Sequence, residues 1–204
     1  FATLDTTTRN VVIGNRAFEN VTDGSDNVLI GEEAGTEITS GTQNTAVGSK
    51  AIKTATTAGG NTAVGREALT LCNANNNTAI GNEAMINSTT GISNTALGAS
   101  AGTGITSGSD NNVFIGASAG NTLTSGDNNI IVGRSAQPSA ASVSNEITLG
   151  DANITSLRIP GLQSGASTND VLTFNGTDIT LAAQLVAPDP VTSSLDIGST
   201  KTIK

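Results

Sequence analysis

The stretch that decides the fold is Asn44-Thr45-Ala46-Val47-Gly48-Ser49-Lys50-Ala51, and it recurs along the chain with small changes. It returns as Asn61-Thr62-Ala63-Val64-Gly65-Arg66-Glu67-Ala68 and as Asn77-Thr78-Ala79-Ile80-Gly81-Asn82-Glu83-Ala84. The shared pattern is an Asn, an aliphatic residue three positions later, a Gly directly after that, and an Ala three positions after the Gly. Repetition at a fixed period indicates a repeat architecture, in which each unit stacks on the next.

The pattern occurs eight times in full and once in altered form. Successive motif Gly residues are 16 to 18 positions apart. The ninth unit, Asn145 to Gly150, carries one inserted residue and lacks the Ala after the Gly. We expect the opening Asn and the motif Gly of each complete unit to shape the corners of the repeat. These corner residues are Asn10, Gly14, Asn27, Gly31, Asn44, Gly48, Asn61, Gly65, Asn77, Gly81, Asn94, Gly98, Asn112, Gly116, Asn129 and Gly133.

A period near 17 predicts a β-solenoid. Helical-hairpin repeats need more than about 30 residues, and the many Gly, Asn and Thr residues disfavour helix. Short β-branched runs between clusters of Gly, Asn and Ser predict strands joined by turns. We therefore expect an all-β parallel solenoid of about nine coils over residues 10–150, which at about 4.8 Å per coil is roughly 40 Å long.

The side chains of each short strand should alternate between two faces. We expect the aliphatic residue before each Gly, such as Val64, to point into the coil, so that the residue before it, such as Ala63, points out. A strand that is apolar on both faces is buried on both faces, so we expect sister chains to cover the outward residues, with close approach at the four central Ala residues. The predicted oligomer interface is Val12, Leu29, Ala46, Ala63, Ala79, Ala96, Phe114 and Ile131.

The Asn and Gly residues have structural explanations. Gly accepts a positive φ angle at a corner without steric cost. Asn residues stacked at one position of every coil can form a ladder of side-chain hydrogen bonds. Cys72 stands where other coils have Val21, Ile38, Ile105 or Leu123, which predicts a small core residue.

The segments outside the repeat differ in character. Residues 1–9 form a Thr-rich lead. Residues 151–163 alternate like a strand and should form a neck. Residues 164–187 predict a β-hairpin module with a two-residue turn at Asn175-Gly176. Pro188 and Pro190 mark residues 188–204 as a linker and the start of a further module.

Composition excludes several classes of function. A net charge of -8 without a basic cluster argues against nucleic acid or an anionic membrane as the partner. No apolar run approaches 18 residues, so we expect no membrane insertion. The single Cys excludes an internal disulfide framework.

Catalysis and ligand binding find little support in the sequence. The chain has no His, which removes the common catalytic triads and most metal catalysis. The carboxylate pairs Glu32/Glu33 and Asp23/Asp26 should lie in solvent-facing corners. The turns around Asp26, Asp110 and Asp127 offer oxygen atoms to Ca²⁺ but lack dense Asp spacing. We expect no enzyme activity, no cofactor and no metal site.

The repeat unit resembles the head repeats of YadA-like trimeric adhesins, and still more the 17-residue version found in phage tail fibres. The segment from Ser144 to Gly150, followed by Ile154 to Arg158, resembles the exit segment of fibre proteins of marine and cyanobacterial phages. Asp196 to Ser199, followed by Lys201 to Lys204, resembles the opening of another fibre module. The resemblance implies a homotrimer of left-handed parallel β-rolls on a virion, with a role in host attachment and with tail or baseplate proteins as neighbours.

Four hypotheses follow. The first is a trimeric fibre or appendage shaft of a phage virion, located extracellularly, and the second is the head of a bacterial trimeric autotransporter adhesin on the cell surface. An ice-binding solenoid is disfavoured because we expect the Thr residues to face inward, and a polysaccharide depolymerase would require paired carboxylates. The chain has no Trp or Tyr to act as a glycan platform, so host glycans or proteins should contact only the variable loops, residues 69–76 and 86–93.

Overall fold

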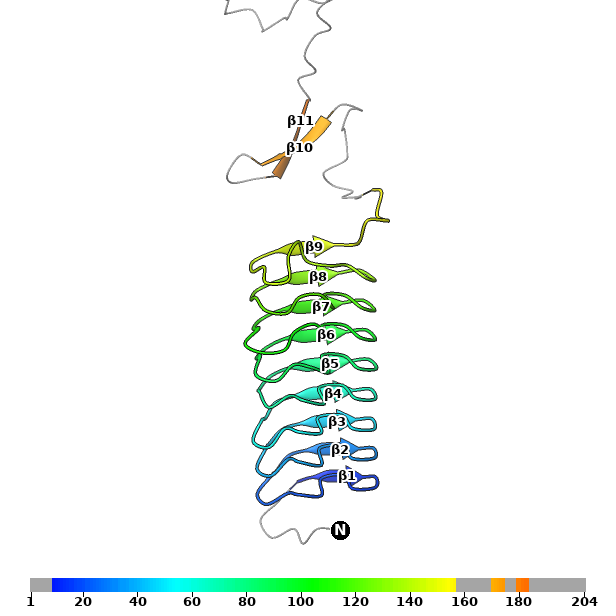
Figure 1. Cartoon of the computed structure of the whole chain (residues 1–204), viewed down its shortest axis with the longest axis vertical. Helices are drawn as coiled ribbons and strands as arrows, with labels where there is room; N and C mark the ends of the chain where they lie inside the picture. Colours follow the sequence, from blue (N-terminus) through cyan, green and yellow to red (C-terminus); the bar gives the residue numbers. More distant parts are fainter. Residues whose placement is uncertain (1–8, 157–169, 175–178, 184–204) are drawn as a thin grey trace, which may run out of the picture. The chain divides into compact units, whose positions relative to one another are not determined.

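The computed structural model describes residues 9–156, 170–174 and 179–183, and these contain strands and turns but no helix. Two compact units divide between Ile154 and Thr155. The first unit holds one strand in every coil (Figure 1). These strands are β1 (Val11–Ile13), β2 (Val28–Ile30), β3 (Thr45–Val47), β4 (Thr62–Val64), β5 (Thr78–Ile80), β6 (Thr95–Leu97), β7 (Val113–Ile115), β8 (Ile130–Val132) and β9 (Ile147–Leu149).

The nine strands form one parallel sheet in sequence order. The repeat positions stay in register, so that Thr45 pairs with Thr62, Thr62 with Thr78, and Thr78 with Thr95. The rest of each coil is a series of turns that leads back to the next strand. The sequence-based prediction of a parallel β-solenoid is confirmed, with about 17 residues per turn.

The motif Gly residues lie where the chain leaves each strand. In the eight complete units their φ angles run from +127° at Gly116 to +142° at Gly81 and Gly98, with Gly65 at +138°, a region that side chains rarely adopt. A second constraint comes from stacking, because a Cβ atom built on Gly65 would lie 2.4 Å from the carbonyl oxygen of Gly81. Gly is therefore required at this corner both for its φ angle and for the close approach of the next coil.

Left-handed backbone also occurs at residues other than Gly. In the third coil, Gln43, Lys50 and Ile52 have φ angles of 60°, 60° and 49°. Such conformations cost energy and persist only where surrounding contacts fix them. Here the backbone hydrogen bonds between coils fix them, as when Ile52 N–H donates to the Ala68 carbonyl oxygen at 3.0 Å.

The motif Asn residues form a buried ladder along the solenoid. Asn44 shows the repeated geometry: its N–H and Nδ2 both donate to Oδ1 of Asn27, at 2.9 and 3.2 Å, and Nδ2 also donates to the Ala58 carbonyl oxygen. The same backbone bond to Oδ1 of the motif Asn one coil below recurs along the solenoid. The first is from Asn27 N–H to Asn10 at 2.9 Å, and the last is from Glu146 N–H to Asn129 at 3.0 Å. Each buried amide thus has partners in its own coil and in a neighbouring one, as buried polar groups require.

The core lies inside the coils and is thin. Its width is set by two positions that face each other: the central residue of each strand and the residue six positions later. Where the strand centre is Ala46, the later residue is the large Ile52, and both are buried. Where the strand centre is Phe114, the later residue is Gly120, and a Cβ atom on Gly120 would lie 2.2 Å from the Phe114 ring. In these two coils a large residue faces a small one, which keeps the core close-packed.

The second unit contains an antiparallel pair, β10 (Asp170–Phe174) and β11 (Ile179–Ala183). The predicted hairpin is present, but its pairing differs from the prediction. Phe174 pairs with Ile179, which leaves residues 175–178 between the strands instead of the two residues of an Asn-Gly turn. The turn itself lies outside the described residues. Of the predicted neck, residues 151–156 are described and form no strand, and residues 157–163 lie outside the described part.

Candidate interaction surface

The structure reverses the predicted orientation of the strand side chains. The strand centres that were expected to face a sister chain are buried inside the chain's own coil. Seven of the eight, all except Val12, have no exposed surface: Leu29, Ala46, Ala63, Ala79, Ala96, Phe114 and Ile131. The prediction of an oligomer interface was therefore wrong for these seven residues, because a side chain already buried within one chain has no surface left to offer another. Val12, in the first coil, is 36% exposed.

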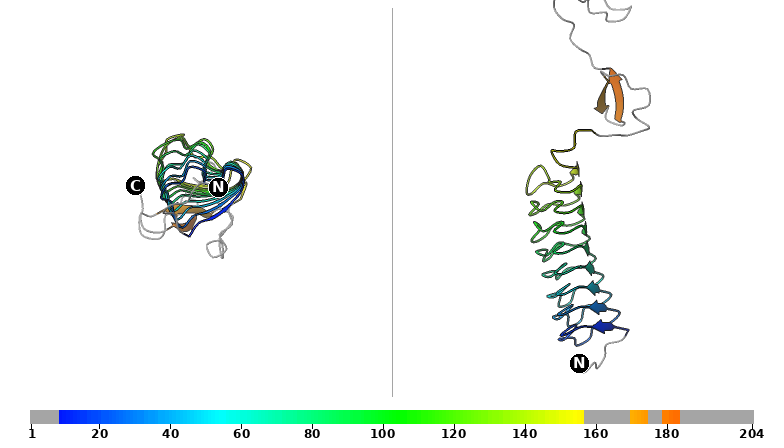
Figure 2. Two further views of the ribbon diagram at one scale, coloured as in Figure 1. Left: turned by 90° about the horizontal axis from the view of Figure 1, so that it is seen from below. Right: turned by 90° about the vertical axis from the view of Figure 1, so that its right-hand side faces the viewer.

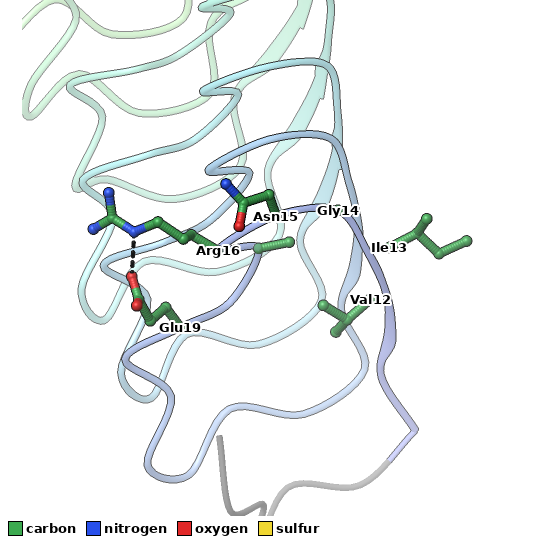
Figure 3. Close-up of a pocket in the computed structure, with 7 residues that line it drawn as sticks. Val12, Ile13, Gly14, Asn15, Arg16 and Glu19 are labelled. Atoms are coloured by element: carbon green, nitrogen blue, oxygen red, sulfur yellow. Dashed lines mark hydrogen bonds and ion pairs between the residues drawn. The ribbon is translucent and has the colours of Figure 1, made fainter. Parts of the chain in front are cut away.

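The residues before the motif Gly point outward instead. Val64 is 36% exposed, Leu97 47% and Ile13 60%. The strands stack along one side of the first unit (Figure 2), and the close-up in Figure 3 shows Val12 directed into the coil and Ile13 directed away from it. The physical reason lies in the return half of the coil, which brings buried residues such as Ile52 and Leu69 under the strand centre, so that the centre needs no external cover.

The outward side chains form two parallel columns on the outer face of the sheet. The column before the motif Gly is wholly aliphatic, and the other column contains Val, Thr and Ile. We call these two columns the outer stripe. Its members are Val11, Ile13, Val28, Ile30, Thr45, Val47, Thr62, Val64, Thr78, Ile80, Thr95, Leu97, Val113, Ile115, Ile130, Val132, Ile147 and Leu149.

The outward direction also changes the argument about ice binding. Thr45, Thr62, Thr78 and Thr95 were expected to face inward, but they lie half-buried on the outer face beside the aliphatic column. The Thr array extends over four coils, and Val28 and Val113 continue the column on either side. The orientation of the Thr residues is therefore compatible with an ice-binding surface. The array ends after four coils, however, and this short extent disfavours ice binding.

The corners after the motif Gly differ between the two halves of the solenoid. In the first coils they carry ion pairs, in which Glu33 accepts from Arg16 at 2.9 Å and from Lys53 at 2.8 Å. The hydrogen bond from Lys53, with the charges of Lys53 and Arg16, holds the pKa of Glu33 below its usual value. Further along, Arg66 pairs with Glu83. The equivalent corner positions of the next three coils carry Ser100, Ser118 and Ser135.

Four of the six carboxylates considered for catalysis or metal binding have other partners in the structure. Asp26 pairs with Arg9, and Glu33 pairs with two cations as described. Asp110 accepts from the N–H of Ile92 at 2.8 Å, and Asp127 accepts from the N–H of Asp110 at 2.8 Å, so both carboxylates tie one coil to another. Among the described residues, no three His, Cys, Asp or Glu side chains lie close enough together to hold a metal ion.

Cys72 is fully buried in the column predicted for it, and burial raises the pKa of its thiol. The neighbouring variable loops, residues 69–76 and 86–93, expose few apolar side chains. Leu71 and Ile92 are exposed there, while Leu69 and Ser88 are buried. The loops therefore offer a smaller apolar surface than the outer stripe, which runs along every coil.

Comparison with known proteins gave no family model, no curated relative and no solved structure that matches this chain. In the part of the chain that the structure describes, no helix is long and apolar enough to span a bilayer.

Proposed function

We propose that this chain is a structural shaft segment of a phage tail fibre or tail appendage, built from three copies that associate through their outer stripes. The observation that carries the proposal is the outer stripe itself. Every one of the nine strands presents an aliphatic residue to the outside at the same register, whether the neighbouring corner is charged or neutral.

The size of the stripe supports association. Nine strands at about 4.8 Å, each about 10 Å long, give a face of roughly 400 Å². The largest apolar patch on a typical monomer covers about 300–600 Å² and often has a function, and this face, which includes four Thr residues, lies in that range. Flat parallel sheets normally have both faces covered. A second and third copy, each presenting the same stripe, would provide that cover.

The number of copies and the biological setting come from the resemblance of the Asn-x-x-aliphatic-Gly-x-x-Ala units to phage fibre repeats. In this proposal the protein is extracellular, belongs to the virion and contacts other tail or baseplate proteins, and it supports attachment to a host-surface glycan or protein. Its role is structural and not catalytic. The head of a bacterial trimeric adhesin is the alternative setting for the same assembly.

Light scattering after size-exclusion chromatography tests the association. Three chains of 20.2 kDa give an expected mass of about 61 kDa. The double variant Ile80→Asp/Leu97→Asp places two charges on the outer stripe and should reduce the mass to that of one chain while the β-type circular dichroism spectrum remains. The matched control Ser100→Asp/Ser118→Asp places two charges at corners outside the stripe and should leave the mass unchanged. A monomeric wild-type chain would refute the assembly.

The genes on either side distinguish the two settings. Neighbouring genes for tail or baseplate proteins would support the virion, whereas a longer reading frame with a secretion leader and a membrane anchor would support the adhesin. Antibodies raised against the chain should label the tails of intact particles in electron micrographs if the virion setting is correct.

A further inference from the structure

The two columns of the outer stripe differ in their middle section. The column before the motif Gly is aliphatic in all nine strands, whereas the other column is aliphatic only towards its ends and carries Thr in four consecutive coils. We call these four residues the Thr tract: Thr45, Thr62, Thr78 and Thr95. The parallel register places each of them beside the next, and Val28 and Val113 bound the tract on its two sides.

The four hydroxyls of the Thr tract have no hydrogen-bond partner within the part of the chain that the structure describes. Thr residues of the turns differ in this respect, because their hydroxyls are used inside the chain. Thr39 Oγ1 donates to the Thr56 carbonyl oxygen at 3.0 Å, and Thr54 Oγ1 donates to the Thr70 carbonyl oxygen at 2.9 Å. The tract therefore presents half-buried hydroxyls on the outer face that the chain itself does not use.

A uniformly aliphatic stripe could not fix how far one copy is displaced along another. The coils repeat at about 4.8 Å, so two parallel copies would meet nearly the same apolar surface after a displacement of one coil. A polar tract with aliphatic residues on both sides removes this ambiguity. Thr side chains that face one another can form hydrogen bonds, whereas a hydroxyl buried against an aliphatic side chain without a partner is unfavourable.

We propose that the Thr tract sets the axial register in which parallel copies of this chain associate. The inference rests on the lateral association proposed above and adds the residues that determine its register. In register, every Thr of the tract lies level with the same Thr of the neighbouring copy, and their hydroxyls pair across the interface. A displacement of one coil places Thr95 level with Val113 of the other copy and Thr45 level with Val28, so that a hydroxyl at each end of the tract loses its partner.

Each further coil of displacement leaves another hydroxyl unpaired at each end, so the penalty grows with the displacement. It acts in both directions along the axis, because aliphatic residues bound the tract on both sides. A single polar residue in the core of a coiled coil has the same effect, since it specifies register at a cost in stability.

Distances between spin labels on the full chain test the register. One preparation carries a nitroxide at Ser49→Cys and a second carries it at Ala117→Cys; both positions directly follow a motif Gly and are four coils apart, about 19 Å along the axis. Cys72 is buried and should remain unlabelled. After the two preparations have exchanged subunits with an excess of unlabelled chain, double electron–electron resonance should report one distance between the two labels.

Removing the hydroxyls should release the register. The variant Thr45→Val/Thr62→Val/Thr78→Val/Thr95→Val retains the shape of the side chains and makes the column wholly aliphatic. We expect additional label distances, displaced by multiples of about 4.8 Å along the axis, and at least tenfold tighter association when the samples are diluted. The matched control Val113→Ile/Ile130→Val exchanges two aliphatic residues beyond the tract and should retain the single distance.

Moving the tract should move the neighbouring copy. The variant Thr45→Val/Val113→Thr displaces the tract by one coil, from β3–β6 to β4–β7. When this variant carries the label at Ala117→Cys and is mixed with wild type labelled at Ser49→Cys, the axial separation should fall from four coils to three, about 14 Å. Mixed only with itself, the variant should give the same distance as wild type.

Three results would overturn this inference: several label distances in wild type, a single unchanged distance in the variant with four Val residues, or no change when the tract is moved. Light scattering on the same samples separates this failure from that of the assembly. A chain that is monomeric at every concentration would refute lateral association and the register with it, whereas a trimer whose register ignores these substitutions would refute the register alone.

Discussion

Adjacent residues of one strand, Ala63 and Val64, meet opposite environments. Ala63 is fully buried in the thin core of the coil, as is Leu69 six positions later. Val64 is 36% exposed on the outer stripe. The inner position varies in size from Ala to Phe, and in several coils a large residue there faces a small one across the core, as Phe114 faces Gly120. The outer position before the Gly stays aliphatic in all nine coils although no residue of the same coil packs over it.

This difference separates two kinds of constraint. The inner column is constrained by volume, because the coil has a fixed width. The outer column is constrained by chemistry, because its residues share apolar character and not size. The inner residues therefore determine whether one chain folds, whereas the outer residues are the ones exposed to a partner in the proposed assembly. Substitutions at the two positions should have distinct effects.

The largest effect is expected for Ala63→Asp. The carboxylate would enter the core without a partner, which costs several kcal/mol, so the coil should open or the chain should fail to fold. Circular dichroism and thermal unfolding measure this. Thr62→Asp, the matched change on the outer face, should retain the β-type spectrum and lose far less stability. Equal losses in the two variants would contradict the separation of inner and outer faces.

A smaller loss is expected for Gly65→Val. The side chain would meet the Gly81 carbonyl oxygen and would force a strained φ angle, which together should cost about 4 kcal/mol in the free energy of unfolding. Gly108 is the matched control, since it also has a positive φ angle of 59° but a Cβ atom built on it would have no other atom within 4 Å. Gly108→Val should cost only the conformational strain, about 1–2 kcal/mol. If urea unfolding gave equal losses of stability for the two variants, contact with the next coil would not explain why Gly is needed at position 65.

Phe114→Ala should follow, with a loss of about 3 kcal/mol. The ring fills the space left by Gly102 and Gly120, so its removal leaves a cavity that small neighbours cannot close. The neighbouring outer residue provides the comparison: Ile115→Ala should change the stability of a single chain by less than about 1 kcal/mol. A reversed order, measured by urea unfolding, would show that Phe114 is not a core residue.

The smallest effect is expected for Ser109→Ala. Its Oγ is buried and has no hydrogen-bond partner within the described residues, while its carbonyl oxygen still accepts from Nδ2 of Asn94 at 2.6 Å. Removing an unpaired buried hydroxyl should be neutral or should stabilise by up to about 1 kcal/mol. Thr36→Val removes a buried hydroxyl that is paired with the Glu33 carbonyl oxygen at 2.8 Å and should cost about 1 kcal/mol.

Much of the fold could be predicted because it depends on periodicity. The Gly spacing of 16 to 18 indicated the number of coils, the parallel order and the register. The Asn ladder also followed from a single stacked position. The inner and outer faces could not be assigned by alternation alone, because alternation establishes only that Ala63 and Val64 face opposite ways. All three residues of most strands are apolar or Thr, so neither face was marked as solvent-facing.

A signal for the correct orientation was nevertheless present in the sequence. In several coils the strand centre and the residue six positions later differ in size in opposite directions, as Ala46 with Ile52, Leu29 with Gly35 and Phe114 with Gly120 show. Ala96 and Gly102 are both small, and there the Phe114 ring of the next coil lies against Gly102. Such compensation is expected only between side chains that share one cavity. The sizes of the central residues along the column do not reveal which way these residues face. Their sizes relative to the residues across the same coil do.

The hydrogen bonds that join the coils run along the stacking direction, and this has a mechanical consequence. Each coil contacts only its neighbours, so a force that pulls the two ends of the solenoid apart acts on every junction in series. The solenoid of a single chain would therefore open at its weakest junction and not share the force among all of them. Chains held side by side through the outer stripe would place their junctions in parallel, and three such chains would divide the same pull among three sets of bonds.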